Sequence, residues 1–191
     1  MGFDGSATHV RAPQSAIVAL LRPIIRSRAV VTPARNGWTS VYDESSVRSL
    51  AEGSRVSGAL SKRLATVGIY TSVFDSDILR YALFDHGRKV DEFHSAPNYF
   101  APASESTIRR TAGRPSILKS YCRAHVSDTA IRKLLTRDDP DWEGDEEERL
   151  LLLANVLRID PDRATDYFAQ AIETRGQGYV TILGHLPHEN R

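Results

Sequence analysis

Hydrophobic and polar positions form their clearest pattern in the middle of the chain. Segment 67–74 is rich in β-branched and aromatic residues, and a second run of this kind follows over 78–84. A tight turn with a glycine, at residues 85–88, leads into a third run over 90–94. The pattern predicts a β-meander over 67–95. Because both faces of its first two strands carry apolar residues, we expect helices to cover them.

Weaker strand signals lie on both sides of the meander. Residues 30–32 and 38–42 flank Asn36-Gly37, a dipeptide typical of hairpin turns. Pro33 cannot donate a ladder hydrogen bond, so we expect the first of these strands to be an edge strand at best. Two further strand candidates lie near the C-terminus, at 167–173 and 179–183.

Apolar residues spaced three and four apart predict helices in most of the remaining chain. The expected helices are one ending near 22, one bent helix or two short ones within 45–66, one beginning at Pro115, one capped by Ser127, and one over the apolar segment 150–157. In the last of these we expect Leu150, Leu153, Ala154 and Leu157 to be core residues. The acidic residues over 138–148 are placed to stabilise the start of that helix.

Together these elements predict an α+β fold. A mixed, mostly antiparallel sheet contains the meander, helices pack on its faces, and the C-terminal segment is helical. Residues 1–12 are small, polar and without a period, so we expect a flexible tail there. Residues 13–191 are expected to form a single domain.

Composition narrows the classes of function. The 191 residues are 41% hydrophobic and 26% charged, with a formal net charge of +1. Such a balance is typical of a globular protein and creates no general attraction to nucleic acid or to an anionic membrane, so we expect neither as a partner. We see no apolar signal segment and no run near the roughly 20 residues that span a bilayer, and therefore expect a cytoplasmic protein.

Motifs for cofactors and metals are missing from the sequence. It has no Walker A string, no Gly-x-Ser-x-Gly elbow and no His-Glu-x-x-His pair, and its single cysteine, Cys122, cannot form an internal disulfide. His185 and His188 have a spacing seen in metal sites, but neither a carboxylate nor a cysteine accompanies them. We expect no cofactor and no metal ion.

Topology suggests one candidate site. If the strands ending at Tyr42 and Phe74 are parallel in one sheet, their ends and the end of the third meander strand share one edge. That edge would hold Asp43, Glu44, Asp75, Asp77, His94, Asn98 and Tyr99. Clustered carboxylates can bind Mg²⁺ or Ca²⁺ or share a proton in catalysis. The simpler interpretation, which we favour, is that these are ordinary turn and helix-cap residues.

Several strings carry a resemblance to known sequences. WTSVYDE at 38–44, VFDSDIL at 73–79 and VDEFHSAPNYF at 90–100 resemble a bacterial family of uncharacterised proteins. The resemblance covers about residues 36–100 and brings no activity with it. It implies that five residues belong to recurring strings: Asp43, Asp75, Asp77, Asp91 and Tyr99.

The leading functional hypothesis is a non-catalytic binding protein with a protein partner, such as an intracellular inhibitor or immunity-type protein. The alternative is a hydrolase or ligand-binding enzyme that uses the acidic edge, with or without a divalent metal. A third hypothesis, nucleic-acid binding through Arg109, Arg110, Arg114 and Arg123, has no motif behind it. An enzyme should show a pocket lined by the acidic edge, whereas a binding protein should show an exposed apolar patch or a face of one charge.

Overall fold

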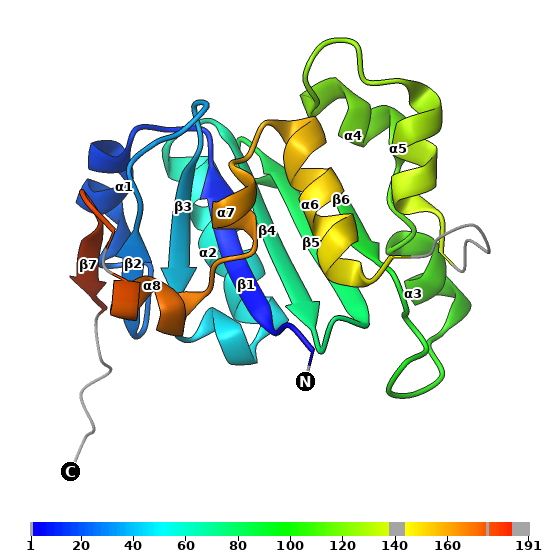
Figure 1. Ribbon diagram of the computed structural model, residues 1–191, viewed down its shortest axis with the longest axis horizontal. Coiled ribbons are helices and arrows are strands. Elements are labelled where there is room, and N and C mark those ends of the chain that lie inside the picture. Colours follow the sequence, from blue (N-terminus) through cyan, green and yellow to red (C-terminus); the bar gives the residue numbers. More distant parts are fainter. Residues whose placement is uncertain (1, 138–143, 175, 185–191) are drawn as a thin grey trace.

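A seven-stranded antiparallel sheet lies at the centre of the computed structural model, which describes residues 2–137, 144–174 and 176–184 (Figure 1). The strands are arranged in the order β6-β5-β4-β1-β3-β2-β7. Their bounds are β1 Gly5–Val10, β2 Arg28–Val31, β3 Thr39–Asp43, β4 Val67–Phe74, β5 Ile78–Asp85, β6 Arg88–His94 and β7 Val180–Leu183. The expected α+β fold with its mostly antiparallel sheet is confirmed.

Helices cover both faces of the sheet, and further helices lie beside its edge strand β6 (Figure 1). On one face lie α1 (Gln14–Leu21), the 3₁₀ turn η1 (Ser46–Arg48) and α2 (Leu50–Arg63). On the other lie α6 (Glu146–Leu157), α7 (Pro161–Ala164) and α8 (Phe168–Thr174). Beside β6 lie α3 (Glu105–Arg110), α4 (Pro115–Tyr121) and α5 (Asp128–Leu135). No helix in the described ranges has the length and apolar character needed to cross a membrane.

The meander is present as predicted. β4, β5 and β6 are consecutive antiparallel strands, with Ser72 opposite Arg80 and Arg80 opposite His94. Gly87 adopts a positive φ of 81° in the turn between β5 and β6, which explains the glycine there. On the α6 side, Leu79, Tyr81 and Leu83 share one core with the α6 leucines. The predicted core residues are buried, with exposed fractions of 2% for Leu150, 1% for Leu153 and Ala154, and 0% for Leu157.

The β2–β3 hairpin is also confirmed, but the position of β2 in the sheet is not as expected. Asn36 and Gly37 both have positive φ, as a tight hairpin turn requires. β2 is not an edge strand, because β7 pairs along its other side with Ala29 opposite Ile182. Pro33 lies after the last residue of β2, so its missing N–H does not interrupt the ladder.

Residues 5–10 contradict the prediction of a flexible tail over 1–12. They form β1, which lies between β3 and β4 and is buried along its whole length. Its residues are mostly small, and small side chains suit a strand that is covered by helices on both faces. Of its six residues only Ala7 and Val10 are hydrophobic, so a search for apolar alternation misses the strand.

Local signals fixed the ends of several helices correctly. Ser127 Oγ accepts the Ala130 N–H at the start of α5, and Pro115 is the first residue of α4. Segment 45–66 forms one turn of 3₁₀ helix and then a single α2, rather than a bent helix or two short ones. Residues 168–174 are helical, not the expected strand, whereas 180–183 do form β7. The first part of the acidic run, 138–143, and the pair His185 and His188 lie outside the described residues.

Candidate functional site

The predicted acidic edge has the expected strand directions. β3 and β4 are both antiparallel to β1, so they run in the same direction, and β6 shares that direction because it pairs with β5. The residues that end these three strands therefore lie at one end of the sheet. However, β1 separates β3 from β4, and two strand spacings keep their ends about 10 Å apart.

At the β3 end, the carboxylates are occupied by neighbouring groups. Asp43 is 3% exposed and accepts hydrogen bonds from the hydroxyls of Ser27, Ser45 and Ser46, at 3.2, 2.8 and 2.7 Å. Glu44 forms an ion pair with Arg28 at 2.8 Å. These contacts fix the turn that leads from β3 into η1.

At the β4 end, the polar side chains hold two loops. Asp75 accepts the backbone N–H of Gly2 at 2.9 Å, and Asp77 accepts the phenol of Tyr99 at 2.8 Å. This hydrogen bond raises the pKa of Tyr99. Asn98 accepts the N–H of Ala103 within the loop after β6, at 2.9 Å. Among the described residues, no group of three or more His, Cys, Asp or Glu side chains is arranged to hold a metal ion.

A different group of residues surrounds a hollow on the α2 side of the sheet. This hollow has a volume of about 510 Å³ and lies between the start of α2, β5, β6 and α3. Apolar groups of Leu50, Ala51, Ala82, Phe93 and Pro97 line it, together with Arg80, Lys89, Glu92, His94 and Arg110. Its size is within the range of ligand pockets, and its lining combines apolar walls with a few polar groups.

Arg80 is the central charged residue of this hollow. It is half-buried, and burial lowers its pKa, although a guanidinium stays protonated at neutral pH. Its Nε donates to Nε2 of His94 at 3.0 Å. Among the described residues, no carboxylate lies within ion-pair distance of Arg80. Burial and the nearby positive charges of Arg80 and Arg137 lower the pKa of His94 to about 4, so the ring is neutral and can accept this bond.

A second hollow, of about 310 Å³, lies on the other side of Arg80. It is bounded by β1, β4, η1 and the start of α2, and it shares Leu50 and Arg80 with the first hollow. We call the two together the Arg80 groove. The strand register explains its polar floor, because Ser6 lies opposite Ser72, Ser72 opposite Arg80, and Arg80 opposite His94. One cross-strand row therefore carries four polar side chains on the α2 face.

Exposed apolar side chains gather at the rim of the smaller hollow. Val47, Leu50, Phe74 and Phe100 line it with exposed fractions of 50, 39, 44 and 65%. Tyr99 packs edge-on against Phe100, whose ring also contacts Phe74 and lies under the Arg80 guanidinium at 6.0 Å. Large exposed apolar groups gathered in one place often mark a binding surface.

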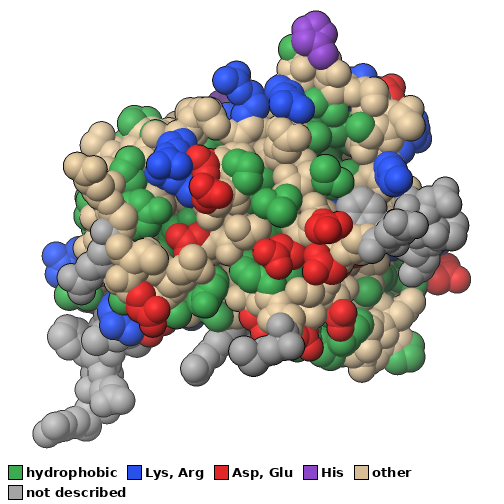
Figure 2. Space-filling model, viewed as in Figure 1, with side chains coloured by type: hydrophobic (Ala, Val, Ile, Leu, Met, Phe, Trp, Pro, Cys, Tyr) green, Lys and Arg blue, Asp and Glu red, His purple; other side chains and the backbone are tan. Residues whose placement is uncertain are grey.

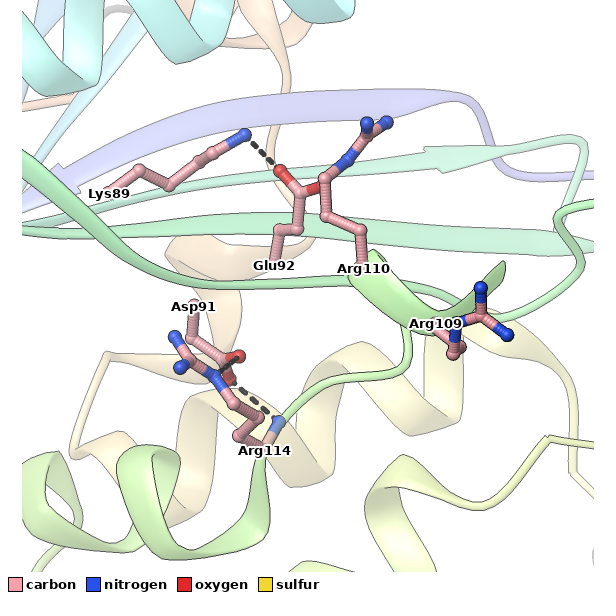
Figure 3. A pocket seen from close by; sticks show the side chains of 6 residues that line it. All are labelled: Lys89, Asp91, Glu92, Arg109, Arg110 and Arg114. Carbon is pink, nitrogen blue, oxygen red and sulfur yellow. Dashed lines mark hydrogen bonds and ion pairs between the residues drawn. The ribbon is translucent and has the colours of Figure 1, made fainter. Parts of the chain in front are cut away.

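Positive side chains continue from the groove around the edge strand β6. A third hollow of about 310 Å³ shares Lys89, Glu92 and Arg110 with the groove. Figure 3 shows Lys89 and Arg110 directed at Glu92 on one side of β6, and Arg114 beside Asp91 on the other. Arg110 Nε lies 2.7 Å from Glu92, which Lys89 also contacts. Two cations therefore share one carboxylate.

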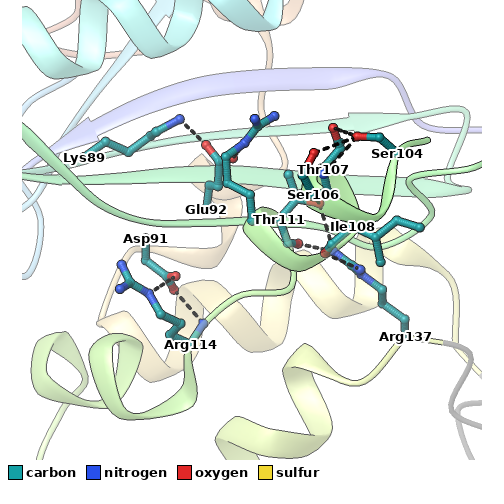
Figure 4. A network of polar contacts seen from close by, with 11 residues as sticks. Lys89, Asp91, Glu92, Ser104, Ser106, Thr107, Ile108, Thr111, Arg114 and Arg137 are labelled. Atoms are coloured by element: carbon teal, nitrogen blue, oxygen red, sulfur yellow. Dashed lines mark hydrogen bonds and ion pairs between the residues drawn. The ribbon is translucent and has the colours of Figure 1, made fainter.

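Arg137 positions α3 beside the groove (Figure 4). Its guanidinium donates to the carbonyls of His94 and Ile108 at 2.8 and 3.0 Å, and to the Thr111 hydroxyl at 3.0 Å. Ser104 caps the start of α3 by accepting the Thr107 N–H. The groove wall formed by α3 is thus tied to the end of β6 by one side chain.

No protein-family model, curated protein or solved structure matches the chain. The resemblance of residues 36–100 to a bacterial family stays a prediction.

Of the residues expected at the acidic edge, His94 lines the Arg80 groove and Tyr99 packs at its rim. Arg80 was not predicted, although one signal was available: it is the one charged residue within the run 78–84, whose other side chains are apolar or aromatic.

Proposed function

We propose that the protein is a non-catalytic binding protein whose Arg80 groove receives an acidic segment of a protein partner. The observation that supports this most is the ring of exposed apolar side chains around a half-buried arginine that has no carboxylate partner among the described residues. Aromatic residues and arginine are enriched in protein interfaces and dominate their binding energy. Inhibitors and immunity-type proteins belong to this class.

Charge supports an acidic partner. In the larger hollow, the described cations Arg80, Lys89 and Arg110 face the single carboxylate of Glu92. The whole chain has a formal net charge of only +1, so this excess is local. On the face that carries α6, α7 and α8, by contrast, Asp and Glu side chains lie mainly in the middle and Lys and Arg mainly at the margins (Figure 2). A positively charged groove that meets an acidic segment favours one orientation of the partner and raises the association rate.

Because Arg80 is half-buried, its substitution is the most informative test of binding to an acidic partner. An ion pair formed by an exposed arginine contributes little, because water screens it. Arg80 is half-buried and is held by His94, so a carboxylate that reaches it is less screened and needs less ordering of the side chain. The enzyme alternative has weaker support, since the carboxylates of the acidic edge already hold turns and loops.

Fluorescence anisotropy with a defined probe tests the proposal. The probe is a labelled peptide of alternating acidic and aromatic residues, compared with the same peptide carrying Asn and Gln in place of Asp and Glu. We expect saturable binding of the acidic peptide and a loss of about tenfold or more in affinity for Arg80→Gln. Arg22→Gln, which removes the same charge from an exposed position after α1, should bind like the wild type.

Two outcomes would overturn the proposal. One is equal binding of the acidic and amide peptides, since charge would then play no part. The other is tighter binding of a random DNA or RNA oligonucleotide than of the peptide, with a steep salt dependence, because that would indicate a nucleic-acid surface.

A further inference from the structure

The strand register divides the Arg80 groove into three rows of side chains. Phe74, Ser72 and Tyr70 follow one another along the groove side of β4, with Arg80 opposite Ser72 and Ala82 opposite Tyr70. Residues two apart on a strand are separated by about 7 Å, so each row lies about 7 Å from the next. A segment that lies along these strands therefore meets the three rows in a fixed order.

The first row, at Phe74, favours an apolar side chain. The rings of Phe74 and Phe100 pack edge-on there, and both are exposed to solvent. The carboxylate of Asp4 lines the same hollow and accepts the Asp75 N–H at 2.9 Å. Because this negative charge repels an acidic group, the smaller hollow suits an aromatic residue that covers the two exposed rings.

The second and third rows offer positive charge. Arg80 lies in the second row, and no described carboxylate lies within ion-pair distance of it. In the third row, Glu92 lies opposite Ala82 and is contacted by both Lys89 and Arg110 (Figure 3). Two cations against one carboxylate leave one positive charge in excess. Acidic side chains of a partner therefore suit both of these rows.

The outer edge of β6 is already occupied beside the second and third rows. The His94 N–H donates to the Thr111 carbonyl and the Glu92 carbonyl accepts the Gly113 N–H, each at 3.0 Å. An extended partner segment therefore cannot add a strand to the sheet at this point. If it lay across the face of the sheet instead, its own backbone N–H and C=O groups would be buried without partners. An α-helix avoids both problems, because it satisfies its backbone groups internally.

From the order of the rows and the occupied edge we propose that the acidic segment is an amphipathic α-helix, with an aromatic residue on its docking face and acidic residues four and eight positions away. Four helical residues rise about 6 Å, close to the step between rows. The aromatic side chain packs on Phe74 and Phe100. The first acidic side chain pairs with Arg80 and the second with Arg110 and Lys89. Because the same groove receives the helix, its assignment rests on the proposed function.

Fluorescence anisotropy with two labelled peptides of identical composition tests the helix. The helical-pattern peptide carries Phe, Glu and Glu at positions i, i+4 and i+8 of an Ala/Ser host, made in both chain orders. The strand-pattern peptide carries them at i, i+2 and i+4. We expect the better helical-pattern peptide to bind the full chain at least fivefold more tightly than the strand-pattern peptide. Its carbon chemical shifts in the bound state should be helical.

Substitutions on both sides of the interface test the register. Arg110→Gln should weaken binding of the helical-pattern peptide about threefold, and should have no effect once the peptide carries Gln at i+8. Arg80→Gln should depend in the same way on the Glu at i+4. Arg109→Gln is the matched control, because Arg109 precedes Arg110 in α3, pairs with Glu105 and does not line the groove. It should bind like the wild type, and wild-type amide spectra of all variants show that no loss comes from unfolding.

Failure of the helix and failure of the proposed function give different results. If neither acidic peptide binds more tightly than its counterpart with Gln in place of Glu, the proposed function is wrong. If the acidic peptides do bind, two results overturn the helix alone. One is equal or tighter binding of the strand-pattern peptide. The other is a loss for Arg110→Gln that is the same with Glu and with Gln at i+8.

Discussion

Replacing Gly53 with alanine tests the packing of α2 on the sheet beside the Arg80 groove. Gly53 is buried in the first half of α2, and a Cβ atom added there would overlap the ring of Tyr70. Tyr70 is 1% exposed and is held by its hydrogen bond to the Ser46 carbonyl. The ring cannot move aside without breaking that bond or displacing its neighbours in the core.

Two effects of opposite sign decide the outcome. Alanine is better than glycine in the interior of a helix by about 1 kcal/mol. Forcing an extra methyl group into a packed core costs about 1–3 kcal/mol. Because the overlap is as close as 2.0 Å and the ring is held by its hydrogen bond, overpacking should prevail, and we expect a net loss of about 1–2 kcal/mol in the free energy of unfolding.

Gly58 provides the matched control in the same helix. A Cβ atom there would meet Phe84 Cε1 at 3.0 Å, a tight contact that a small displacement of the ring relieves. Gly58→Ala should therefore change stability by less than about 1 kcal/mol. Urea unfolding followed by far-UV circular dichroism measures the free energy of unfolding of both variants. Equal m-values would show that the variants expose the same surface area on unfolding, so that their free energies can be compared. If Gly53→Ala proves as stable as the wild type, α2 does not approach Tyr70 as described.

Three further predictions concern buried or half-buried groups. Leu153→Ala should lower the free energy of unfolding by about 2–5 kcal/mol, since Leu153 is 1% exposed, and a loss below about 1 kcal/mol would place α6 at the surface. Burial lowers the pKa of His9 to about 3, so the unfolded chain binds a proton at His9 below about pH 6.5 that the folded chain does not. Stability should consequently fall as the pH falls, by about 2 kcal/mol at pH 5, and His9→Gln should reduce that slope in urea titrations. Burial raises the pKa of Cys122 to about 11, so iodoacetamide should alkylate it more slowly at pH 7 than it alkylates a free peptide thiol, and an equal rate would contradict this environment.

The sequence predicted those parts of the fold in which local pattern and tertiary role agree. The meander, the β2–β3 hairpin and the caps at Ser127 and Pro115 were predictable because each depends on a few neighbouring residues. Gly53 shows where local reasoning is insufficient. Glycine in a helix suggests a weak or bent helix, but this glycine allows close approach to Tyr70, which is distant in sequence.

The residues of the candidate site likewise divide into those that a local pattern predicts and those whose role depends on tertiary structure. The expected common direction of β3, β4 and β6 is present, since β3 and β4 both pair antiparallel with β1 and β6 follows from the meander, and this direction places His94 and Tyr99 at the groove. Arg80 could have been flagged as a charge inside an apolar strand, but its role depends on Ser6, Ser72 and His94, which reach it only through the sheet register.

One missed strand explains both the site that was expected and the site that was overlooked. Without β1, β3 and β4 would be neighbours, and the acidic residues at their ends would face each other across a single strand spacing. With β1 between them, the two ends are about 10 Å apart, and each carboxylate instead holds its own turn. β1 also brings Ser6 next to Ser72, which completes the polar row on the α2 face. The strand that separates the carboxylates is therefore also the strand that adds Ser6 to the polar floor of the Arg80 groove.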